Sequence, residues 1–412
     1  MVDLIHERCA GLDVGKDEVT ACVRTPEESG GRRQEIHTYA TFTSRLEDLA
    51  EWLASKGVTE VAMEATGQYW KPVWYVLEDR GFELLLVNAR HVKILPGRKT
   101  DVGDAAWLAE LLEHGLLRGS FVPPAAIREL RDLTRYRKRM IQALASEGQR
   151  IEKTLQDAGI KLDSVASDIL GVSGRAMLRA LASGERDPAV LAGLAKGRLR
   201  TKERELREAL RGRFGEHHAL LVSLALEHVE HLEAAIARLD ARVDEVMAPF
   251  AAARDRLDTI TGVGKRAAEC MIAEIGVDMG VFPTASHLAS WAGRCPGNNV
   301  TGGKRGSGKT RKGDVWLADV LTECAWAAAR SRDTYLSAQF WRLARRIGKK
   351  KATVAVGHSI LVIAWHLLTY DCDYEELGGN FFVRRDTDRA RQRAVSQLQA
   401  LGYQVTLEPT AA

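Results

Sequence analysis

The sequence has few of the features that mark several large classes of protein. Its six cysteines form no C-x-x-C pair, so we expect neither a zinc finger nor a redox motif, and they are too few for a disulfide scaffold. A reducing cytoplasm fits best. The start of the chain lacks the apolar segment of a signal peptide. The most apolar run, 352–368, is shorter than a membrane span and holds Gly357, His358 and His366, which predicts a buried helix and no membrane partner.

An excess of one charge is also lacking, because the formal net charge is only +4. The cations nevertheless gather in the runs 135–139, 304–312 and 345–351. Such runs on a near-neutral chain indicate a polyanionic partner, although each could equally be a solvated helix face. The length of 412 residues leaves room for two or three domains.

The first quarter of the chain predicts an α/β arrangement, in which a hairpin-led sheet precedes β-α-β-α units. Ser44 looks like a helix N-cap with Glu47 three residues later, as in a capping box. The very apolar strand 84–88 is expected to be central and buried on both faces. The expected elements are a hairpin over 8–24, strands 36–42, 58–65 and 84–88, and helices 44–55, 68–80 and 101–114.

Four carboxylates in this region are candidates for a metal site. Asp13 and Glu64 each lie in an apolar segment just before a turn, and Asp101 and Asp104 are spaced to project from one side of a helical turn. Carboxylates can hold a pair of Mg²⁺ ions that activate a hydroxyl and stabilise a leaving oxygen on phosphorus. The local alternative is that the four residues cap turns, end strands in solvent or start a helix.

Beyond Pro123 the chain predicts helices. Two long stretches, 127–155 and 217–246, carry apolar residues at nearly heptad spacing, so we expect them to pair with each other or with another chain. His228 and His231 lie in the second stretch, where packing is a better explanation than metal binding. The expected seam of that stretch is Leu221, Leu224, His228, Leu232, Ala235, Leu239, Val243 and Val246.

A glycine-rich turn follows Pro249. Gly262 and Gly264, with Lys265 and Arg266 directly after them, look like half of a helix-hairpin-helix element. In such an element the backbone N–H groups at a helix N-terminus bind a phosphate. The alternative is an ordinary helix start.

The stretch 303–310 matches the phosphate-loop pattern G-x-x-x-x-G-K-[ST]. No apolar strand precedes it, so nucleotide binding is not favoured. A flexible basic loop is the better interpretation, because cations there would neutralise several phosphates. Its hydroxyls, on Thr301, Ser307 and Thr310, could attack phosphorus or simply bind a phosphate oxygen. The candidate phosphate-binding cations are Lys304, Arg305, Lys309, Arg311 and Lys312.

Taken together, these motifs resemble the DEDD transposases of bacterial insertion sequences. The resemblance rests on Leu-Asp-Val-Gly-Lys around Asp13, Glu-Ala-Thr-Gly around Glu64, and Lys-Thr-Asp-Val-Gly-Asp-Ala at 99–105. Later come Ile-Thr-Gly-Val-Gly from residue 260, Ala-Gly-Arg-Cys-Pro-Gly-Asn-Asn at 292–299, and then Gly-Lys-Arg and Thr-Arg-Lys-Gly. The resemblance covers about residues 8 to 370. The combination of these blocks in this order is more specific than any block alone.

The resemblance implies a RuvC-like domain of the RNase H type at 1–125, with the four carboxylates as a Mg²⁺-binding tetrad. It further implies a coiled-coil region at 126–250 that assembles a dimer or tetramer, and a mostly helical transposase domain at 251–370. A polar tail, 371–412, would follow. The expected activity is cutting and rejoining DNA, guided by a structured non-coding RNA, in the bacterial cytoplasm at the nucleoid. A junction-resolving Mg²⁺ endonuclease and a non-catalytic nucleic-acid scaffold are the alternatives.

The resemblance also implies a serine nucleophile five residues after the proline of the basic loop. Counted from Pro296, that position holds Thr301. A threonine hydroxyl has the same chemistry on a stiffer side chain. Ser307, six residues later, is the rival candidate.

Overall fold

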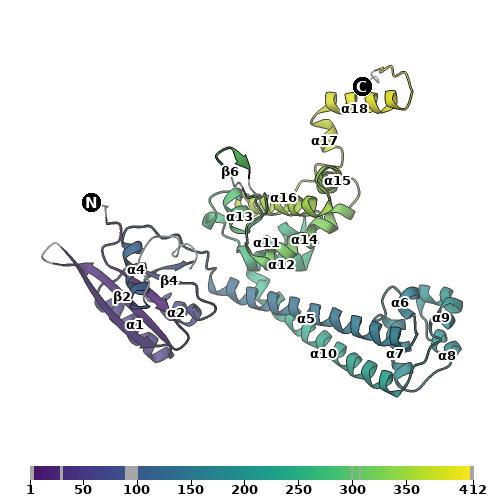
Figure 1. Ribbon diagram of the computed structural model, residues 1–412, viewed down its shortest axis with the longest axis horizontal. Coiled ribbons are helices and arrows are strands. Elements are labelled where there is room, and N and C mark those ends of the chain that lie inside the picture. Colours follow the sequence, from purple (N-terminus) through teal and green to yellow (C-terminus); the bar gives the residue numbers. More distant parts are fainter. Residues whose placement is uncertain (1–3, 28–30, 89–100, 298–299, 306–307, 409–412) are drawn as a thin grey trace. The chain divides into compact units, whose positions relative to one another are not determined.

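The structure of the protein is a computed structural model, which describes residues 4–27, 31–88, 101–297, 300–305 and 308–408 (Figure 1). The chain divides into two compact units, Met1–Val122 and Pro123–Ala412. The first unit combines a sheet with helices, and the second consists of helices with one short hairpin. The order of fold types, α/β and then all-α, is therefore as the sequence predicted.

The first unit is built on a mixed five-stranded sheet with β1 at its centre. β1 pairs antiparallel with β2 and parallel with β4, and β3 and β5 form the two edges. The polar turn between β1 and β2 closes the hairpin that was expected there. The strands are Cys9–Val14 (β1), Glu18–Pro26 (β2), Arg32–Ala40 (β3), Glu60–Glu64 (β4) and Glu83–Val87 (β5).

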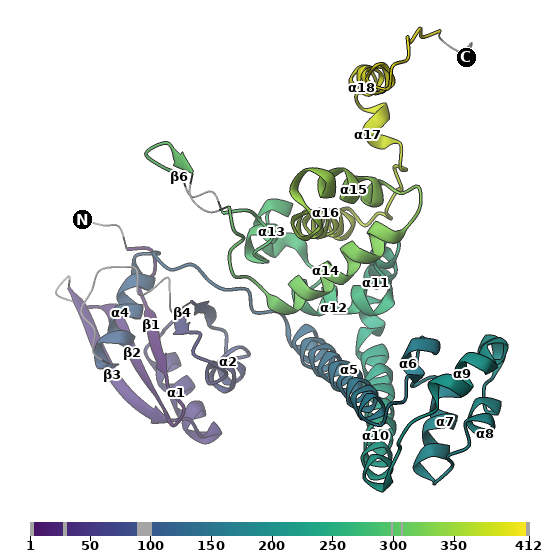
Figure 2. The same cartoon turned by 45° about the vertical axis from the view of Figure 1, so that its right-hand side comes forward.

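Helices cover both faces of this sheet, as Figure 2 shows for α1, α2 and α4. α1 (Thr43–Ser55) and α2 (Trp70–Leu77) bury their apolar sides against one face, in a core that includes Leu12 of β1. α4 (Asp101–Glu113) covers the opposite face and packs on Gly11 of β1. Successive residues of β1 thus face different helices, because side chains alternate along a strand.

Two expectations for this unit are wrong. α1 begins at Thr43 rather than after Ser44, and its N-cap, Phe42, offers no side-chain hydrogen bond. The strand at 83–87 is β5, which lies at the edge of the sheet instead of at its centre. Its apolar residues are buried chiefly because helix α4 and the segment around Gly119 pack against it, so an apolar run here did not imply a central position.

The second unit begins with two long helices, α5 (Ala125–Asp157) and α10 (Glu216–Met247), which lie side by side (Figures 1 and 2). They are antiparallel, because residues later in α5 contact residues earlier in α10. Three polar pairs follow this order: Glu129 with Arg242 at 2.5 Å, Glu147 with His228 at 2.9 Å, and Asp157 with His218 at 3.0 Å.

The predicted seam of α10 is wrong in the first half of the helix. Leu221, Leu224 and His228 are exposed, whereas Val222 and Leu226 are buried. The reason is that α10 packs against α7 as well as α5, so its buried side follows the 3.6-residue period of a helix with two neighbours rather than a heptad seam. The full buried set is His218, Val222, Leu226, Val229, Leu232, Ile236, Val243 and Met247.

Short helices fill the connection between α5 and α10 and share one apolar core with the ends of both. They occupy residues 162–209. They are α6 (Leu162–Val165), α7 (Val172–Ala182), α8 (Pro188–Gly193), the 3-10 helix η1 (Gly197–Lys202) and α9 (Glu203–Ala209).

Among the remaining helices of the second unit, α16 (Lys349–Tyr370) packs against α11, α13, α14 and α15. α16 is long and apolar enough to cross a membrane by length and composition, yet half of its most apolar window is buried inside the protein. The others are η2 (Ala248–Phe250), α11 (Ala251–Asp258), α12 (Lys265–Ile275), η3 (Met279–Val281), α13 (Ala285–Trp291), α14 (Val315–Arg330), α15 (Tyr335–Ile347), α17 (Phe381–Arg384) and α18 (Thr387–Ala400).

The basic run 135–139 lies on α5 where this helix meets α12 and α14. Arg135 forms two hydrogen bonds to the buried carboxylate of Glu274, at 2.8 and 2.7 Å, and Arg131 bonds to the carbonyls of Ala273 and Glu274. Lys138 pairs with Asp319 at 2.5 Å. Most of the cations in this run therefore join helices within the protein.

Candidate functional site

Asp13 and Glu64 lie side by side on the sheet. β1 and β4 are parallel, and their register pairs Leu12 with Met63. The next residue of each strand is Asp13 or Glu64, and neighbouring strands are about 4.8 Å apart. Leu12 and Met63 face the α1 core, so both carboxylates project from the opposite face, which α4 covers. Both side chains are half-buried.

Helix α4 directs its first turn toward these two carboxylates. Gly11 of β1 lies against the middle of α4, next to Ala105 and Ala109. Cys9, earlier in β1, contacts Ala109 through its Sγ, and Ile5, earlier still, donates to the carbonyl of Glu113 at 2.9 Å. The helix therefore runs opposite to β1.

The two remaining carboxylates of the predicted set stand in that first turn. Asp104 is half-buried, and Asp101 is the residue at which α4 begins, although its side chain lies outside the described residues. The N-terminus of a helix carries partial positive charge, which reduces the cost of gathering acidic groups there. The fold thus brings elements far apart in sequence to one end of one sheet face.

The sheet register adds two hydroxyls that the sequence did not indicate. Thr20 pairs with Asp13 across β1 and β2, and Thr38 pairs with Thr20 across β2 and β3. Their hydroxyl oxygens are 3.2 Å apart. The face therefore carries a polar row from Glu64 through Asp13 to Thr38, and only the strand pairing could have revealed it.

In the second unit, the basic loop forms a hairpin. β6 (Val300–Thr301) pairs antiparallel with β7 (Lys304–Arg305). Gly302 and Gly303 connect them with φ values of +55° and +76°, and two consecutive positive φ angles are typical of a type I′ hairpin turn. Thr301 therefore occupies the strand position next to the turn. Figure 1 shows β6 projecting from the helices around it.

This hairpin contradicts the phosphate-loop pattern. Such a loop would run from a strand directly into a helix, whereas Gly303 lies in a hairpin turn and Thr310 forms a bridge with Pro296. The next helix, α14, begins only at Val315, where the carboxylate of Asp314 accepts the N–H of Leu317 and occupies the N-terminus. Ser307 lies outside the described residues.

The base of the hairpin is held by glycine packing and by a buried arginine. A Cβ on Gly313 would be 2.3 Å from the carbonyl of Ala292, so only glycine allows the two ends of the loop to meet. Arg294, 8% exposed, donates to the carbonyl of Ala318 and to the hydroxyl of Thr322 on α14. Burial lowers the pKa of the Arg294 guanidinium, which the carboxylate of Asp319 partly offsets. Neither feature was predicted.

The predicted cations of the loop face water. Lys304, Lys309, Arg311 and Lys312 are exposed, and the side chain of Arg305 lies outside the described residues. Among the described residues, Lys304, Arg311 and Lys312 form no ion pair. Exposed cations without acidic partners suit a polyanion.

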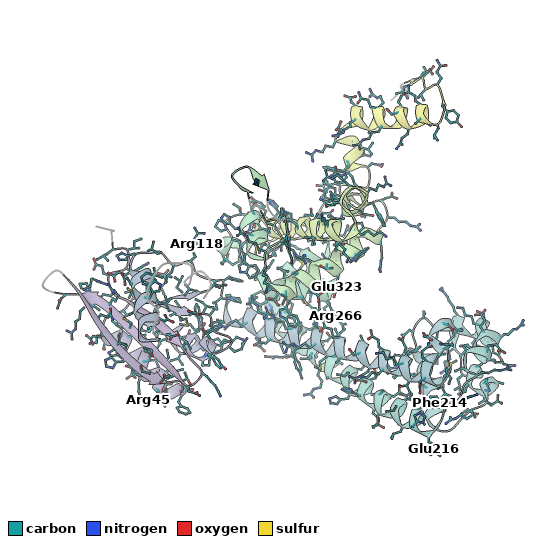
Figure 3. The ribbon with its side chains drawn as sticks, in the orientation of Figure 1. Arg45, Arg118, Phe214, Glu216, Arg266 and Glu323 are labelled. Carbon is teal, nitrogen blue, oxygen red and sulfur yellow. The ribbon has the colours of Figure 1, made fainter. Side chains whose placement is uncertain are left out.

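The glycine-rich turn at Gly262 and Gly264 has two different halves. Gly262 has a φ of +88°, and a Cβ there would be 2.6 Å from backbone atoms of α14, so this glycine serves packing. Gly264 is the N-cap of α12 and has open space beside it. Lys265 and Arg266 are exposed but pair with Asp244 and Asp240 of α10, each at 2.6 Å (Arg266 is labelled in Figure 3). Phosphate binding by these residues stays a prediction.

Within the described residues, one group of three metal-type side chains has ligand atoms within 4.8 Å of one another: Asp157, His217 and His218. His218 Nδ1 accepts the N–H of Gly215 at 2.9 Å, so its Nε2 donates to Asp157 at 3.0 Å. Both ring nitrogens are thus used at the start of α10, near the labelled Phe214 and Glu216 in Figure 3. A helix cap explains this group.

Two family models match the chain in the regions that carry these features. The model of the DEDD transposase of IS110 matches residues 10–160, and the transposase model of the IS116/IS110/IS902 family matches residues 254–342. The first contains all four carboxylates, and the second contains the hairpin. The chain belongs to the IS110 family of DEDD transposases.

Curated relatives of this transposase come from Sinorhizobium fredii. "Putative transposase y4pF/y4sB" is 26% identical over 331 residues, which are 78% of this chain and 76% of that protein. "Putative transposase y4qE" is 26% identical over 308 residues, which are 72% of this chain but only 63% of that protein. The transposase thus spans less than two thirds of the length of the second relative.

Among solved structures, the transposase matches RuvC of Thermus thermophilus, alone and in complex with a Holliday junction substrate. The identities are 14% and 15%, and each match covers 27% of this chain and 99% of the other, with a TM-score of 0.22. We draw no conclusion from a likeness at this TM-score.

Proposed function

We propose that this transposase cuts and rejoins the DNA of an insertion sequence, using Mg²⁺ held by the carboxylate set and a hydroxyl of the hairpin as nucleophile. The observation that carries the proposal is the register of β1 and β4, which sets Asp13 beside Glu64 under the first turn of α4. The mixed sheet of the first unit supports the RuvC-like, RNase H-type domain that the family resemblance implied.

The donor set fits a hard divalent cation, because every available donor is a carboxylate oxygen. Asp13, Glu64 and Asp104, with Asp101, would hold it at the α4 end of the sheet. Bound Mg²⁺ would polarise the phosphoryl oxygens and stabilise the leaving oxygen. The carboxylates would position the metal ions. Because the negative charges repel one another, they would stay ionised side by side only when cations offset that repulsion.

The hairpin supplies the second part of the reaction. We propose that the Thr301 hydroxyl attacks phosphorus, forms a bond from its oxygen to the DNA strand and releases the 3′-hydroxyl, and that a later attack by a DNA hydroxyl reverses the link. Ser307 is the rival nucleophile. The cations Lys304, Arg305, Lys309, Arg311 and Lys312 would hold the phosphates around it.

The test compares Asp13→Ala, Thr301→Ala and Ser307→Ala in a plasmid recombination assay, with Gly308→Ala as a loop control, because a Cβ at Gly308 would have open space. Loss of recombination in soluble Asp13→Ala is the expected result, and full activity would exclude the carboxylate site. A protein–DNA adduct that survives in both hydroxyl variants would exclude the hairpin as nucleophile. Junction cleavage without any adduct would instead favour a resolving endonuclease, and Mg²⁺-independent binding without cleavage would favour a scaffold.

We also propose a homo-oligomer, dimer or tetramer, assembled through the helical pair. Leu221 and Leu224, 51% and 54% exposed, line a groove of about 470 Å³ between α5 and α10, next to Leu220, which is 61% exposed. Exposed leucines in a row on a helix suit a second copy. Leu221→Glu with Leu224→Glu should lower the mass measured by light scattering, whereas Glu227→Gln should not.

The remaining proposals rest on the family resemblance. We propose four domains at 1–125, 126–250, 251–370 and 371–412, a phosphate-binding role for Gly262, Gly264, Lys265 and Arg266, and a bacterial cytoplasmic location at the nucleoid. A structured RNA of the element would guide the recombination. RNA that copurifies with the protein and that recombination requires would support this guide, and full activity after RNase treatment would contradict it.

A further inference from the structure

The C-terminal arm, α17 and α18, lies beyond residues 254–342, where the second family match ends. Its first helix is anchored to α15 by aromatic contacts. The ring of Phe381 is 5.0 Å from that of Tyr335, and the ring of Phe382 is 5.3 Å from it. The guanidinium of Arg342 on α15 lies 4.0 Å above the Phe382 ring. The first helix of the arm, α17, is therefore held against α15.

A groove of about 740 Å³ follows this anchor, and arginines dominate its lining. Arg342 comes from α15, Arg385 from the turn between α17 and α18, and Arg389 and Arg393 from α18. The last two are four residues apart and so share one side of the helix. The acid of the groove, Asp386, accepts the N–H of Arg389 at 3.2 Å and caps α18.

These arginines differ from the cations of α5 and α12 that lie where helices of the second unit meet. Arg135 and Lys138 on α5, and Lys265 and Arg266 on α12, all have carboxylate partners. The four groove arginines are exposed, and none has an ion pair within the described residues. The basic run 345–351, also exposed, continues from the same helix, α15. Unpaired cations that line one groove repel each other until a polyanion enters.

Helix α18 itself lacks the packing that normally stabilises a helix. None of its 14 residues is buried. Isolated helices of about 12–15 residues are marginal in water, so most of the stability of such a helix must come from something it contacts. The side that carries Arg389 and Arg393 offers charge for that contact.

We propose that this groove binds the phosphate backbone of duplex DNA, as a second DNA-contacting surface separate from the hairpin. The choice of duplex follows from the lining. Single strands and RNA loops are bound largely by stacking bases on exposed aromatic rings. The aromatic ring of this groove is Phe382, which Arg342 already covers. The proposal rests on the proposed function in that DNA is the substrate, but it requires no catalysis.

The experiment measures the binding of a labelled duplex DNA without Mg²⁺ across a range of salt concentrations. Arg389→Gln with Arg393→Gln removes two groove cations. The matched control, Arg384→Gln with Arg391→Gln, removes the same charge from the same arm outside the groove lining, where Arg391 pairs with Asp388. Each lost phosphate contact should reduce the slope of log K against log salt by about 0.9. We expect the groove variant to lose about 2 from the slope and the control almost nothing.

Four results would overturn the proposal. Equal losses in both double variants would show an effect of net charge alone. A groove variant that binds duplex DNA as the wild type does would remove the groove from DNA binding while leaving the proposed function intact. A weaker affinity of the groove variant for a structured RNA, with duplex binding unchanged, would assign the groove to RNA. Failure of the wild type to bind any duplex would contradict both this proposal and the proposed function.

Discussion

Gly11 gives the sharpest test of how the fold assembles the carboxylate set. A Cβ at this position would lie 2.3 Å from the carbonyl oxygen of Ala105 and 2.4 Å from the N–H nitrogen of Ala109. Both are backbone atoms of α4, so no side-chain rotation can relieve the overlap. Ordinary contact begins near 3.4 Å, and Gly11→Ala must therefore move α4 away from β1 by about 1 Å, the difference between 3.4 and 2.3 Å.

Two consequences follow from that shift. Overpacking of this kind costs on the order of 1–3 kcal/mol of unfolding free energy, which lowers the Tm of the first unit by roughly 5–10 °C. The first turn of α4 carries Asp101 and Asp104, and a 1 Å misplacement of catalytic groups can cost about 100-fold in rate. Strand cleavage should therefore fall much more than the amount of folded protein.

The assay pairs a thermal melt with a Mg²⁺-dependent cleavage rate for Gly11→Ala. Gly31→Ala is the matched control in the same unit, because its Cβ would meet only the flexible end of the Glu27 side chain at 3.1 Å. Wild-type stability and cleavage in Gly11→Ala would refute the reasoning. A stable protein with no cleavage would show that the position of α4 matters more to the site than to the fold.

Three further predictions concern the second unit. Urea unfolding should show that Glu274→Leu lowers the unfolding free energy by about 3 kcal/mol, because it leaves Arg135 and Arg131 without their buried carboxylate. The control Glu323→Ala removes an exposed partner of Lys138 and should cost less than about 1 kcal/mol. For Glu376, burial raises the carboxyl pKa, but hydrogen bonds from the backbone N–H groups of Tyr335 and Gly378 outweigh it, so the pKa is lowered. The stabilisation from the Glu376 carboxylate is present above the pKa of the unfolded chain, about 4.3, and is lost as the pH falls through the folded pKa. Hydrogen exchange over residues 371–379 should therefore rise in acid in the wild type, whereas Glu376→Gln should show no such step. Gly303→Val should open the hairpin at a cost of about 1–2 kcal/mol and slow adduct formation, while Gly308→Ala should form the adduct at the normal rate.

Local patterns were enough for the elements and for the candidate residues. The helices beyond Pro123 were predicted as a class from their apolar periods, and Thr334, Asp314 and Thr284 cap three of them as short polar residues do. The carboxylates became candidates because Asp13 and Glu64 each lie in an apolar segment just before a turn, and because Asp101 and Asp104 are three residues apart. What failed locally was Ser44, since chain entry at Phe42 started the helix earlier than the capping pattern suggested.

Features that depend on two elements meeting were beyond the sequence. The edge position of β5, the row from Glu64 to Thr38 and the hydrogen bonds of Arg294 each require knowledge of which strand or helix lies beside which. The same holds for the charges. Arg135 and the groove arginine Arg389 cannot be told apart from the sequence. Only the packing shows that Arg135 joins helices and that Arg389 lines an open groove.

The sequence by itself determined the family and the order of fold types and predicted the four carboxylates, because these depend on residue identity and short-range spacing. The tertiary structure alone decided that Asp13 stands beside Glu64 under the first turn of α4, because that depends on strand register and on a glycine that lets a helix approach. It also decided which cations remain without a carboxylate partner, since that depends on which helices folding brings together.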